Sequence, residues 1–345
     1  MKRFLLAASL LALAASPSFA RDQIRIVGSS TVYPFATTVA EHFAKSTGMK
    51  APVVESTGTG GGVKLFCAGV GEDTPDFVNA SRKIKKAEFE TCVQNGVTDI
   101  TEFKIGYDGL TIAMSAKAPD LNLTRKQIYM ALAKQVPDKD GKLIDNPYKM
   151  WSDIDPALPA KKIEVLGPPP TSGTRDSFAE LYLKKGTEEF PSLVELAAKD
   201  VPAFDAVWKT IRTDGAYVEA GENDNLIIQK IEANPDAFGI FGFSFLEQNK
   251  GKIKAASIEG DQPTNESILL GNYKGSRLLY FYMKKDHLGL VPGMIEYVTE
   301  FTSKAAIGED GYLLDKGLVG LKTCDAEWTA ATIDSLPLVN IDFLK

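Results

Sequence analysis

Residues 24–34 read Ile-Arg-Ile-Val-Gly-Ser-Ser-Thr-Val-Tyr-Pro, and they pass from a short hydrophobic run through a small polar turn toward a helix. Residues 24–27 are rich in β-branched side chains, which is typical of a buried strand. Pro34 suits the first turn of a helix, and apolar residues then recur about every four positions until Gly48. This segment therefore predicts a strand, a turn and a helix in direct succession.

The same order of strand, turn and helix recurs twice further along the chain. Residues 52–55 form a predicted strand that leads into the glycine-rich turn 58–62, and a short helix is predicted to begin in residues 63–68. Residues 77–80 form a third predicted strand, which ends at Ser81-Arg82 and is followed by another helix. Repeated units of this kind predict an α/β fold with a mostly parallel sheet flanked by helices. Ligands of such sheets bind at the carboxyl ends of the strands, where these turns lie.

The length of the chain predicts two lobes. About 325 residues follow a predicted leader, which is more than one hydrophobic core usually supports. Residues 100–115 are strand-like with a break at 106–109, and residues 277–283 are apolar and β-prone, so both are predicted to cross between the lobes. The predicted division is 21–106 plus 278–345 for lobe 1 and 107–277 for lobe 2.

Residues 1–20 predict a signal peptide. Lys2 and Arg3 form a basic start, an apolar run follows, and Ser18-Phe19-Ala20 is a small-x-small site that predicts cleavage after Ala20. The apolar run is too short to span a bilayer, and no later segment is long enough. We therefore expect an exported protein of a bacterial periplasm without direct membrane insertion, with secretion into the medium as the alternative.

Charge and cysteine content narrow the class of protein further. Without Lys2 and Arg3, 37 basic residues stand against 45 acidic ones, a net charge of −8, which argues against a nucleic-acid partner. The three cysteines of the chain are Cys67, Cys92 and Cys324. In an oxidising compartment one disulfide is expected, and we predict Cys67–Cys92 because the two flank the compact segment that ends at Ser81-Arg82. Three buried free thiols are the alternative.

Four turns rich in Gly, Ser, Thr and Arg recur at the predicted strand-to-helix junctions, namely residues 28–31, 57–62, 80–82 and 171–175. Each offers backbone N–H groups and hydroxyls, and Arg82 and Arg175 add guanidinium groups. Helix N-termini carry unpaired N–H donors and a partial positive charge, so they bind phosphate-like groups. The set predicts a pocket for an oxyanion, with no metal and no cofactor. Taken singly, each turn could be an ordinary helix cap, and Arg82 could be a solvated charge.

Taken in order, these motifs resemble the phosphate-specific periplasmic binding proteins that feed an ABC importer, in the branch with Ala-Ser-Arg and Ser-Gly-Thr-Arg turns. The residues that carry the resemblance are 26–34 (IVGSSTVYP), 58–64 (GTGGGVK), 79–84 (NASRKI), 172–178 (SGTRDSF) and 224–225 (DN) through 238–242 (FGIFG). The resemblance implies a two-lobe, type II periplasmic binding protein that closes over one dehydrated anion. It implies inorganic phosphate as the ligand and a membrane permease as the partner, and we expect a monomer.

Carried over position by position, the resemblance implies phosphate ligands from both lobes: Ser30, Thr31, Val32, Thr59, Ser81 and Arg82 from lobe 1, and Ser172, Gly173, Thr174 and Arg175 from lobe 2. The chain departs from some family members, which have an Asp where Arg82 stands and an Arg where this chain has Pro168. In those members the Asp accepts the proton of hydrogen phosphate, which helps to reject sulfate. Here the candidates for this acceptor are Asp224 and, behind it, Asp108.

The sequence leaves three other classes of function as alternatives. A receptor for sulfate, molybdate or tungstate shares the fold and the anion-binding turns. An enzyme, such as a secreted phosphatase, is not expected, because the only histidines are His42 and His287 and neither lies near a Gly-flanked nucleophile. A surface protein that binds a protein partner through residues 135–160, a predicted surface excursion around Trp151, has no specific support.

Overall fold

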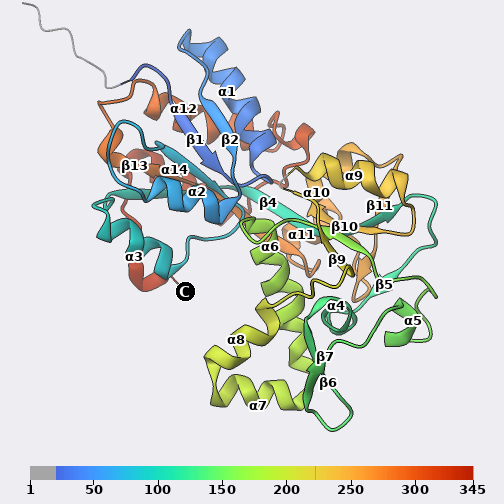
Figure 1. The fold of residues 1–345 in the computed structure, drawn as a ribbon. Coiled ribbons are helices and arrows are strands. Elements are labelled where there is room, and N and C mark those ends of the chain that lie inside the picture. The colour runs from blue at the N-terminus through green and yellow to red at the C-terminus, as the bar shows by residue number, and fades with distance from the viewer. Residues whose placement is uncertain (1–20, 222, 345) are drawn as a thin grey trace, which may run out of the picture.

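The structure, a computed structural model, describes residues 21–221 and 223–344; the predicted signal peptide lies outside them. Within this part of the chain, one nine-stranded sheet runs through the whole molecule in the order β2-β1-β3-β13-β4-β10-β8-β9, with β11 paired to β4 (Figure 1). Five of its strands form lobe 1 or cross between the lobes: β1 (Arg25–Gly28), β2 (Val53–Ser56), β3 (Phe77–Ala80), β4 (Ile100–Ser115) and β13 (Ser276–Lys284). The other four lie in lobe 2: β8 (Val165–Gly167), β9 (Tyr217–Glu219), β10 (Phe238–Gly242) and β11 (Ile253–Ala255).

Each lobe has parallel strands at its outer side and antiparallel pairing where the lobes join. β1 pairs in parallel with β2 and β3, and β8 pairs in parallel with β9 and β10. β13 is antiparallel to both β3 and β4, and β10 is antiparallel to β4. Two small two-stranded sheets complete lobe 2: β5 (Asn122–Leu123) with β12 (Ser257–Ile258), and β6 (Gln135–Pro137) with β7 (Leu143–Asp145).

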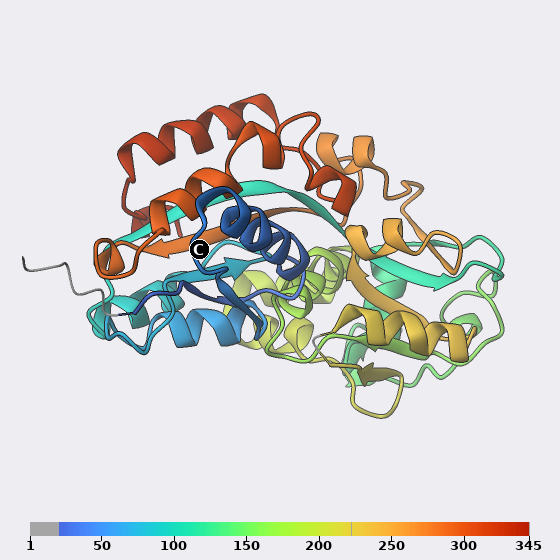
Figure 2. The same cartoon turned by 90° about the horizontal axis from the view of Figure 1, so that it is seen from above.

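Helices cover both faces of the sheet of lobe 1 (Figure 2). These helices are α1 (Tyr33–Thr47), α2 (Thr59–Phe66), α3 (Lys86–Gln94), α12 (Met294–Phe301), α13 (Lys304–Ile307) and α14 (Thr323–Ser335). Ile26 of β1 packs in a core with α1 and α12, whereas the next residue, Val27, packs in a second core with α2 and α3. Successive side chains of a strand point to opposite faces, so a continuous apolar run is needed where both faces are covered.

Lobe 2 has one large core around β4, β8 and β10. Its helices are α4 (Arg125–Leu132), α5 (Trp151–Ile154), α6 (Gly173–Phe178) with the π-helical turn η1 (Ala179–Lys184), α7 (Pro191–Lys199), α8 (Val201–Lys209), α9 (Asp224–Ala233), α10 (Phe243–Gln248) and α11 (Asn265–Leu270). Short 3₁₀ turns in the two lobes are η2 (Thr187–Glu189), η3 (Lys285–His287), η4 (Leu314–Lys316) and η5 (Ile341–Phe343). None of the helices in the described part of the chain is long and apolar enough to cross a bilayer.

Three local predictions are corrected by the structure. β4 is one unbroken strand, and residues 106–109 lie inside it; an irregularity in its pairing with β13 falls between Leu279 and Tyr280. The predicted turn 58–62 forms the beginning of α2. Trp151 is buried at 1% exposure against Phe238, with ring centroids 5.1 Å apart, so it belongs to the core of lobe 2.

Close packing explains the glycine at position 62 in the first turn of α2. A Cβ on Gly62 would lie 2.8 Å from the backbone nitrogen of Gly28 and 3.1 Å from Cγ2 of Val78. Only glycine therefore lets this helix approach β1 so closely.

The predicted disulfide is confirmed. Cys67, which follows α2, is bonded to Cys92 of α3, 25 residues further along. Cys324 is free and exposed. The disulfide joins the two helices that cover one face of lobe 1.

Candidate functional site

Two threonines from opposite lobes meet between the carboxyl end of β1 and the start of α6. Thr31 lies in the turn between β1 and α1, and Thr174 is the second residue of α6. Their Oγ1 atoms are 2.9 Å apart, and both residues are buried. A hydroxyl can donate and accept hydrogen bonds, so each can rotate toward an anion that enters beside them.

A guanidinium that was not among the predicted ligands lies against these hydroxyls. Arg277 of β13 donates from Nη2 to Oγ1 of Thr31 at 3.0 Å, and the distance to Oγ1 of Thr174 is 3.5 Å. Its side chain is only 6% exposed. Nη1 has no hydrogen-bond partner among the residues that the structure describes. We call Thr31, Thr174 and Arg277 the central cluster.

Asp108 holds Arg277 in this place. The two residues are directly opposed in the register of β4 and β13. Oδ2 of Asp108 accepts from Nη2 and Nε of Arg277 at 2.7 and 3.0 Å, and Oδ1 accepts the N–H of Phe243 at 2.9 Å. Burial raises the pKa of Asp108, while Arg277 and the backbone N–H groups oppose this rise.

A second contact between the lobes involves three predicted ligand residues. Thr59 begins α2, and its Oγ1 accepts the N–H of Ser81 at 3.1 Å and lies 3.3 Å from the Ser81 hydroxyl. Gly173, the first residue of α6, packs against both from lobe 2: a Cβ there would lie 2.5 Å from Oγ of Ser81 and even closer to Oγ1 of Thr59. Ser177 of α6 also reaches across, with Oγ 3.4 Å from the Ser81 carbonyl oxygen. The lobes therefore touch at these turns.

The other small residues of the predicted site line the same two turns. Ser30 and Val32 flank Thr31 and are buried. The Ser172 hydroxyl accepts the N–H of Thr174 at 3.2 Å, so Ser172 is the N-cap of α6. The structure thus brings the predicted residues of turns 28–31 and 171–175 together, apart from one arginine described below.

The guanidinium of Arg82 is already paired with carboxylates. It donates from Nη1 and Nη2 to Glu88 at 2.9 and 2.7 Å, and from Nε to Asp176 of lobe 2 at 2.9 Å. Burial of the side chain lowers its pKa, but the hydrogen bonds and charges of Glu88 and Asp176 raise the pKa of Arg82 overall. In this arrangement Arg82 links the lobes at the edge of the site.

Arg175 and Asp224 are two further predicted site residues of lobe 2. The Arg175 guanidinium is 4.3 Å from the centre of the Tyr217 ring, and Nη1 donates to the carbonyl oxygen of Pro168 at 3.3 Å. Asp224 is buried as the first residue of α9. Asp108 contacts the central cluster through Arg277. A role for Arg82, Arg175 or Asp224 in ligand binding stays a prediction.

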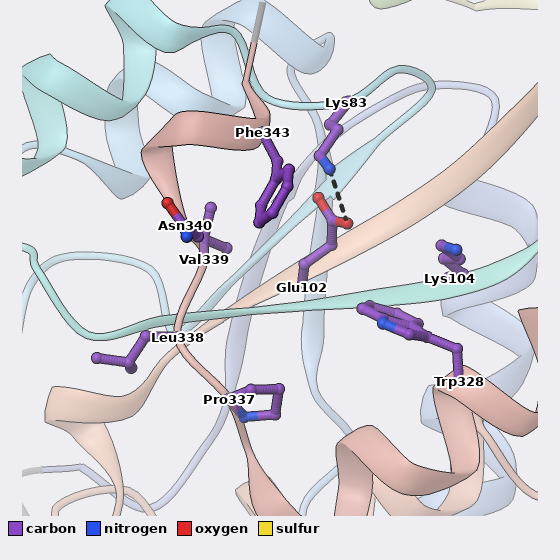
Figure 3. A pocket seen from close by; sticks show the side chains of 9 residues that line it. All are labelled: Lys83, Glu102, Lys104, Trp328, Pro337, Leu338, Val339, Asn340 and Phe343. Carbon is purple, nitrogen blue, oxygen red and sulfur yellow. Dashed lines mark ion pairs between the residues drawn. The ribbon is translucent and has the colours of Figure 1, made fainter.

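A separate cavity of about 420 Å³ lies on lobe 1 between β4, α14 and the C-terminal segment (Figure 3). Figure 3 shows the ion pair of Glu102 and Lys83, with atoms 3.6 Å apart, between Trp328 and Phe343. No predicted ligand residue lines it.

The fold and this placement of the site define a class. Two α/β lobes joined by crossing strands, with hydroxyls and a guanidinium gathered between them, are the architecture of a periplasmic binding protein. Residues 13–305 match the family model described as PBP superfamily domain.

Comparison with similar proteins identifies the family within this class. The phosphate-binding protein PstS of Staphylococcus saprophyticus is 30% identical over 319 residues, which cover 90% of this chain and 83% of that protein. Protein SphX of Synechococcus elongatus is 31% identical over 265 residues, covering 75% of this chain and 67% of that protein. The crystal structure of an ABC-type phosphate transport receptor from Vibrio cholerae has a similar fold, with a TM-score of 0.58, 20% identity and coverage of 86% of this chain and 99% of that one. The chain belongs to the phosphate-binding protein family of the PBP superfamily.

Proposed function

We propose that the protein binds inorganic phosphate between its lobes and delivers it to the membrane permease of an ABC importer. The observation that carries this proposal is the central cluster, in which hydroxyls from both lobes and one guanidinium converge on a single point. Membership of the phosphate-binding family supports the choice of phosphate among the oxyanions. Binding to both lobes at once shifts the equilibrium toward the closed form, and a permease can distinguish that form from the open one.

The chemistry of the site suits an anion that still carries a proton. The hydroxyls of Thr31 and Thr174 donate to the oxygens of the anion, together with backbone N–H groups of the two turns. A buried carboxylate can accept the proton of hydrogen phosphate, and Asp224 and Asp108, both buried, are the two candidates for this acceptor. Sulfate has no proton to give at neutral pH, so it would leave a buried acceptor facing its own negative charge.

The two histidines do not support an enzyme function. The His42 ring stacks on Tyr312 with centroids 3.9 Å apart. His287 is buried in the turn η3, and its Nδ1 lies 2.6 Å from a carboxylate oxygen of Asp76. Both rings are therefore engaged in the packing of lobe 1. We propose a binding protein without catalytic activity, so a chromogenic phosphate ester should not be hydrolysed.

Isothermal titration calorimetry of the ligand-stripped protein tests the proposal. We expect tight one-to-one binding of phosphate and no heat with sulfate or molybdate. Binding of sulfate or molybdate in place of phosphate would keep the class of receptor and overturn its specificity. If none of the three anions binds, the converging turns are helix caps only and the proposal is wrong.

Export, processing and oligomeric state belong to the same proposal. We propose a periplasmic monomer that begins at Arg21 after cleavage. N-terminal sequencing of the exported protein checks the cleavage after Ala20, and size-exclusion chromatography with light scattering checks the monomer.

A further inference from the structure

We propose that Arg277 is an anion-binding residue of this site and that Asp108 positions it. This inference rests on the proposed function and adds to it the source of the main countercharge. That charge comes from the strands that join the lobes, whereas the sequence motifs pointed to Arg82 and Arg175 at the strand-to-helix turns.

The first support is an unsatisfied donor group. A guanidinium has five N–H donors. Asp108 accepts from Nε and Nη2 of Arg277, and Thr31 accepts from Nη2, but Nη1 has no acceptor in the described part of the chain. A buried donor without an acceptor is destabilising, and the side chain is 94% buried. An oxyanion beside Thr31 and Thr174 would supply the missing acceptor, and it is the ligand type that a guanidinium binds with paired hydrogen bonds.

The second support is that the described contacts of the rival guanidiniums are with other groups. Arg82 is bound by the carboxylates of Glu88 and Asp176. Arg175 lies on the Tyr217 ring and donates to a backbone carbonyl. Neither has a described contact with the hydroxyls of the central cluster, whereas Arg277 contacts that of Thr31.

The third support is the position of the pair in the fold. Asp108 lies on β4 and Arg277 on β13, the two strands that continue from lobe 2 into lobe 1. The two residues are paired directly in the register of these strands. The positive charge of Arg277 on these crossing strands is therefore available to an anion before the lobes close. Thr31 then adds its hydroxyl from lobe 1 and Thr174 from lobe 2. The cation thus belongs to both the open and the closed forms, and closure adds the neutral donors.

The test measures phosphate affinity by calorimetry in the full mature protein and in two neutral variants, Arg277→Gln and Arg277→Met. We expect each to bind phosphate about 100-fold more weakly, because a charge-assisted, buried contact is lost. Arg277→Lys should fall between these variants and the wild type, since an ammonium keeps the charge but not the fork of donors. Thermal unfolding of each variant without phosphate shows whether it folds. The test needs only one of the two neutral variants to be folded.

Arg212→Gln is the matched control. Arg212 is another buried arginine of lobe 2, paired with Asp214 and with the carbonyl oxygens of Ala131 and Tyr148. Its loss should lower the unfolding temperature and leave phosphate affinity within about threefold of the wild type, which is the range that additivity at distant sites allows.

The role of Asp108 is tested by a double-mutant cycle with Asp108→Asn and Arg277→Gln. A positioning residue acts through its partner, so Asp108→Asn should weaken binding in the wild type and have little further effect once Arg277 is replaced. An equal effect in both backgrounds would mean that Asp108 acts independently of Arg277. If the wild type binds phosphate and the folded neutral variants of Arg277 bind it equally well, this inference is wrong while the proposed function stands. If the wild type binds no oxyanion, the proposed function itself fails.

Discussion

Adding one methyl group at Gly173 should weaken phosphate binding without lowering the stability of the fold. In Gly173→Ala the new Cβ would lie 2.5 Å from Oγ of Ser81 and from Cβ of Thr59, about 1 Å less than an ordinary van der Waals contact. Gly173 belongs to lobe 2, and both of these neighbours belong to lobe 1. The clash is therefore relieved when the lobes move apart, which would stretch the 2.9 Å contact between the hydroxyls of Thr31 and Thr174.

The size of the effect follows from the free energy of overpacking. Forcing an extra methyl group into a packed contact costs about 1–3 kcal/mol. If this acts on the closed form alone, phosphate affinity falls by about 5- to 140-fold, since 1.4 kcal/mol corresponds to a factor of ten. The unfolding temperature without ligand should change little, because the lobes can stay open.

Calorimetry with phosphate and thermal unfolding without it measure the two quantities. Gly61→Ala is the control in the glycine-rich segment of α2, because its Cβ would have no neighbour nearer than 3.8 Å. Gly62→Ala provides the opposite case: its clash with Gly28 lies within lobe 1, so it should lower the unfolding temperature itself. Wild-type affinity in Gly173→Ala would refute closure at this contact. A loss of unfolding temperature as large as that of Gly62→Ala would show that the clash acts on the fold.

Three further predictions concern charge, the disulfide and pH. Arg82→Ala and Arg175→Ala should each weaken phosphate binding by about tenfold or more if they contact the anion; unchanged affinity in both, measured by calorimetry, would remove them from the site. Replacing both Cys67 and Cys92 by Ser should lower the free energy of unfolding by about 3 kcal/mol in denaturant titrations, whereas Cys324→Ser should have no such effect; equal stability of the double variant and the wild type would contradict this. Burial lowers the pKa of Lys284 from 10.5 to about 8, so the unfolded chain holds this proton more tightly than the folded one. Stability should therefore rise between about pH 8 and 10.5 through this group, and Lys284→Met should show a smaller rise in the free energy of unfolding over that interval.

The sequence predicted the fold where local patterns and tertiary packing agree. The strand at 77–80 and the helix that starts near Pro34 and stops at Gly48 appear as expected, as β3 and α1. The errors come from packing partners that lie far away in the sequence. Trp151 stands in a segment rich in Pro, Asp and Lys, and only its contact with Phe238, 87 residues later, makes it a core residue.

The candidate site shows the same contrast between residues that a local pattern marks and residues whose role depends on a distant partner. Thr31, Thr59 and Thr174 could be placed because small polar residues after predicted strands mark anion-binding turns. Arg277 could not, because it begins an apolar strand and has no motif around it; its meaning depends on Asp108, 169 residues earlier in the chain. The signal that points to Arg277 is a charged residue at the start of a run that is otherwise apolar and that is predicted to cross between the lobes.

The position of β13 in the sheet has a consequence for the order in which the chain folds. β13 lies between β3 and β4, so the sheet of lobe 1 is incomplete until residues 276–284 have been synthesised. Lobe 2 is continuous in sequence, and nearly all of its core residues precede β13, with Val319 as an exception. We expect lobe 2 to form first during synthesis, with β3 left as an unpaired edge until β13 is added, and such edges are prone to aggregation. A chain that stops before β13 would thus keep about four-fifths of its residues and still lack a complete sheet in lobe 1. The last fifth of the protein completes the lobe that its first residues begin.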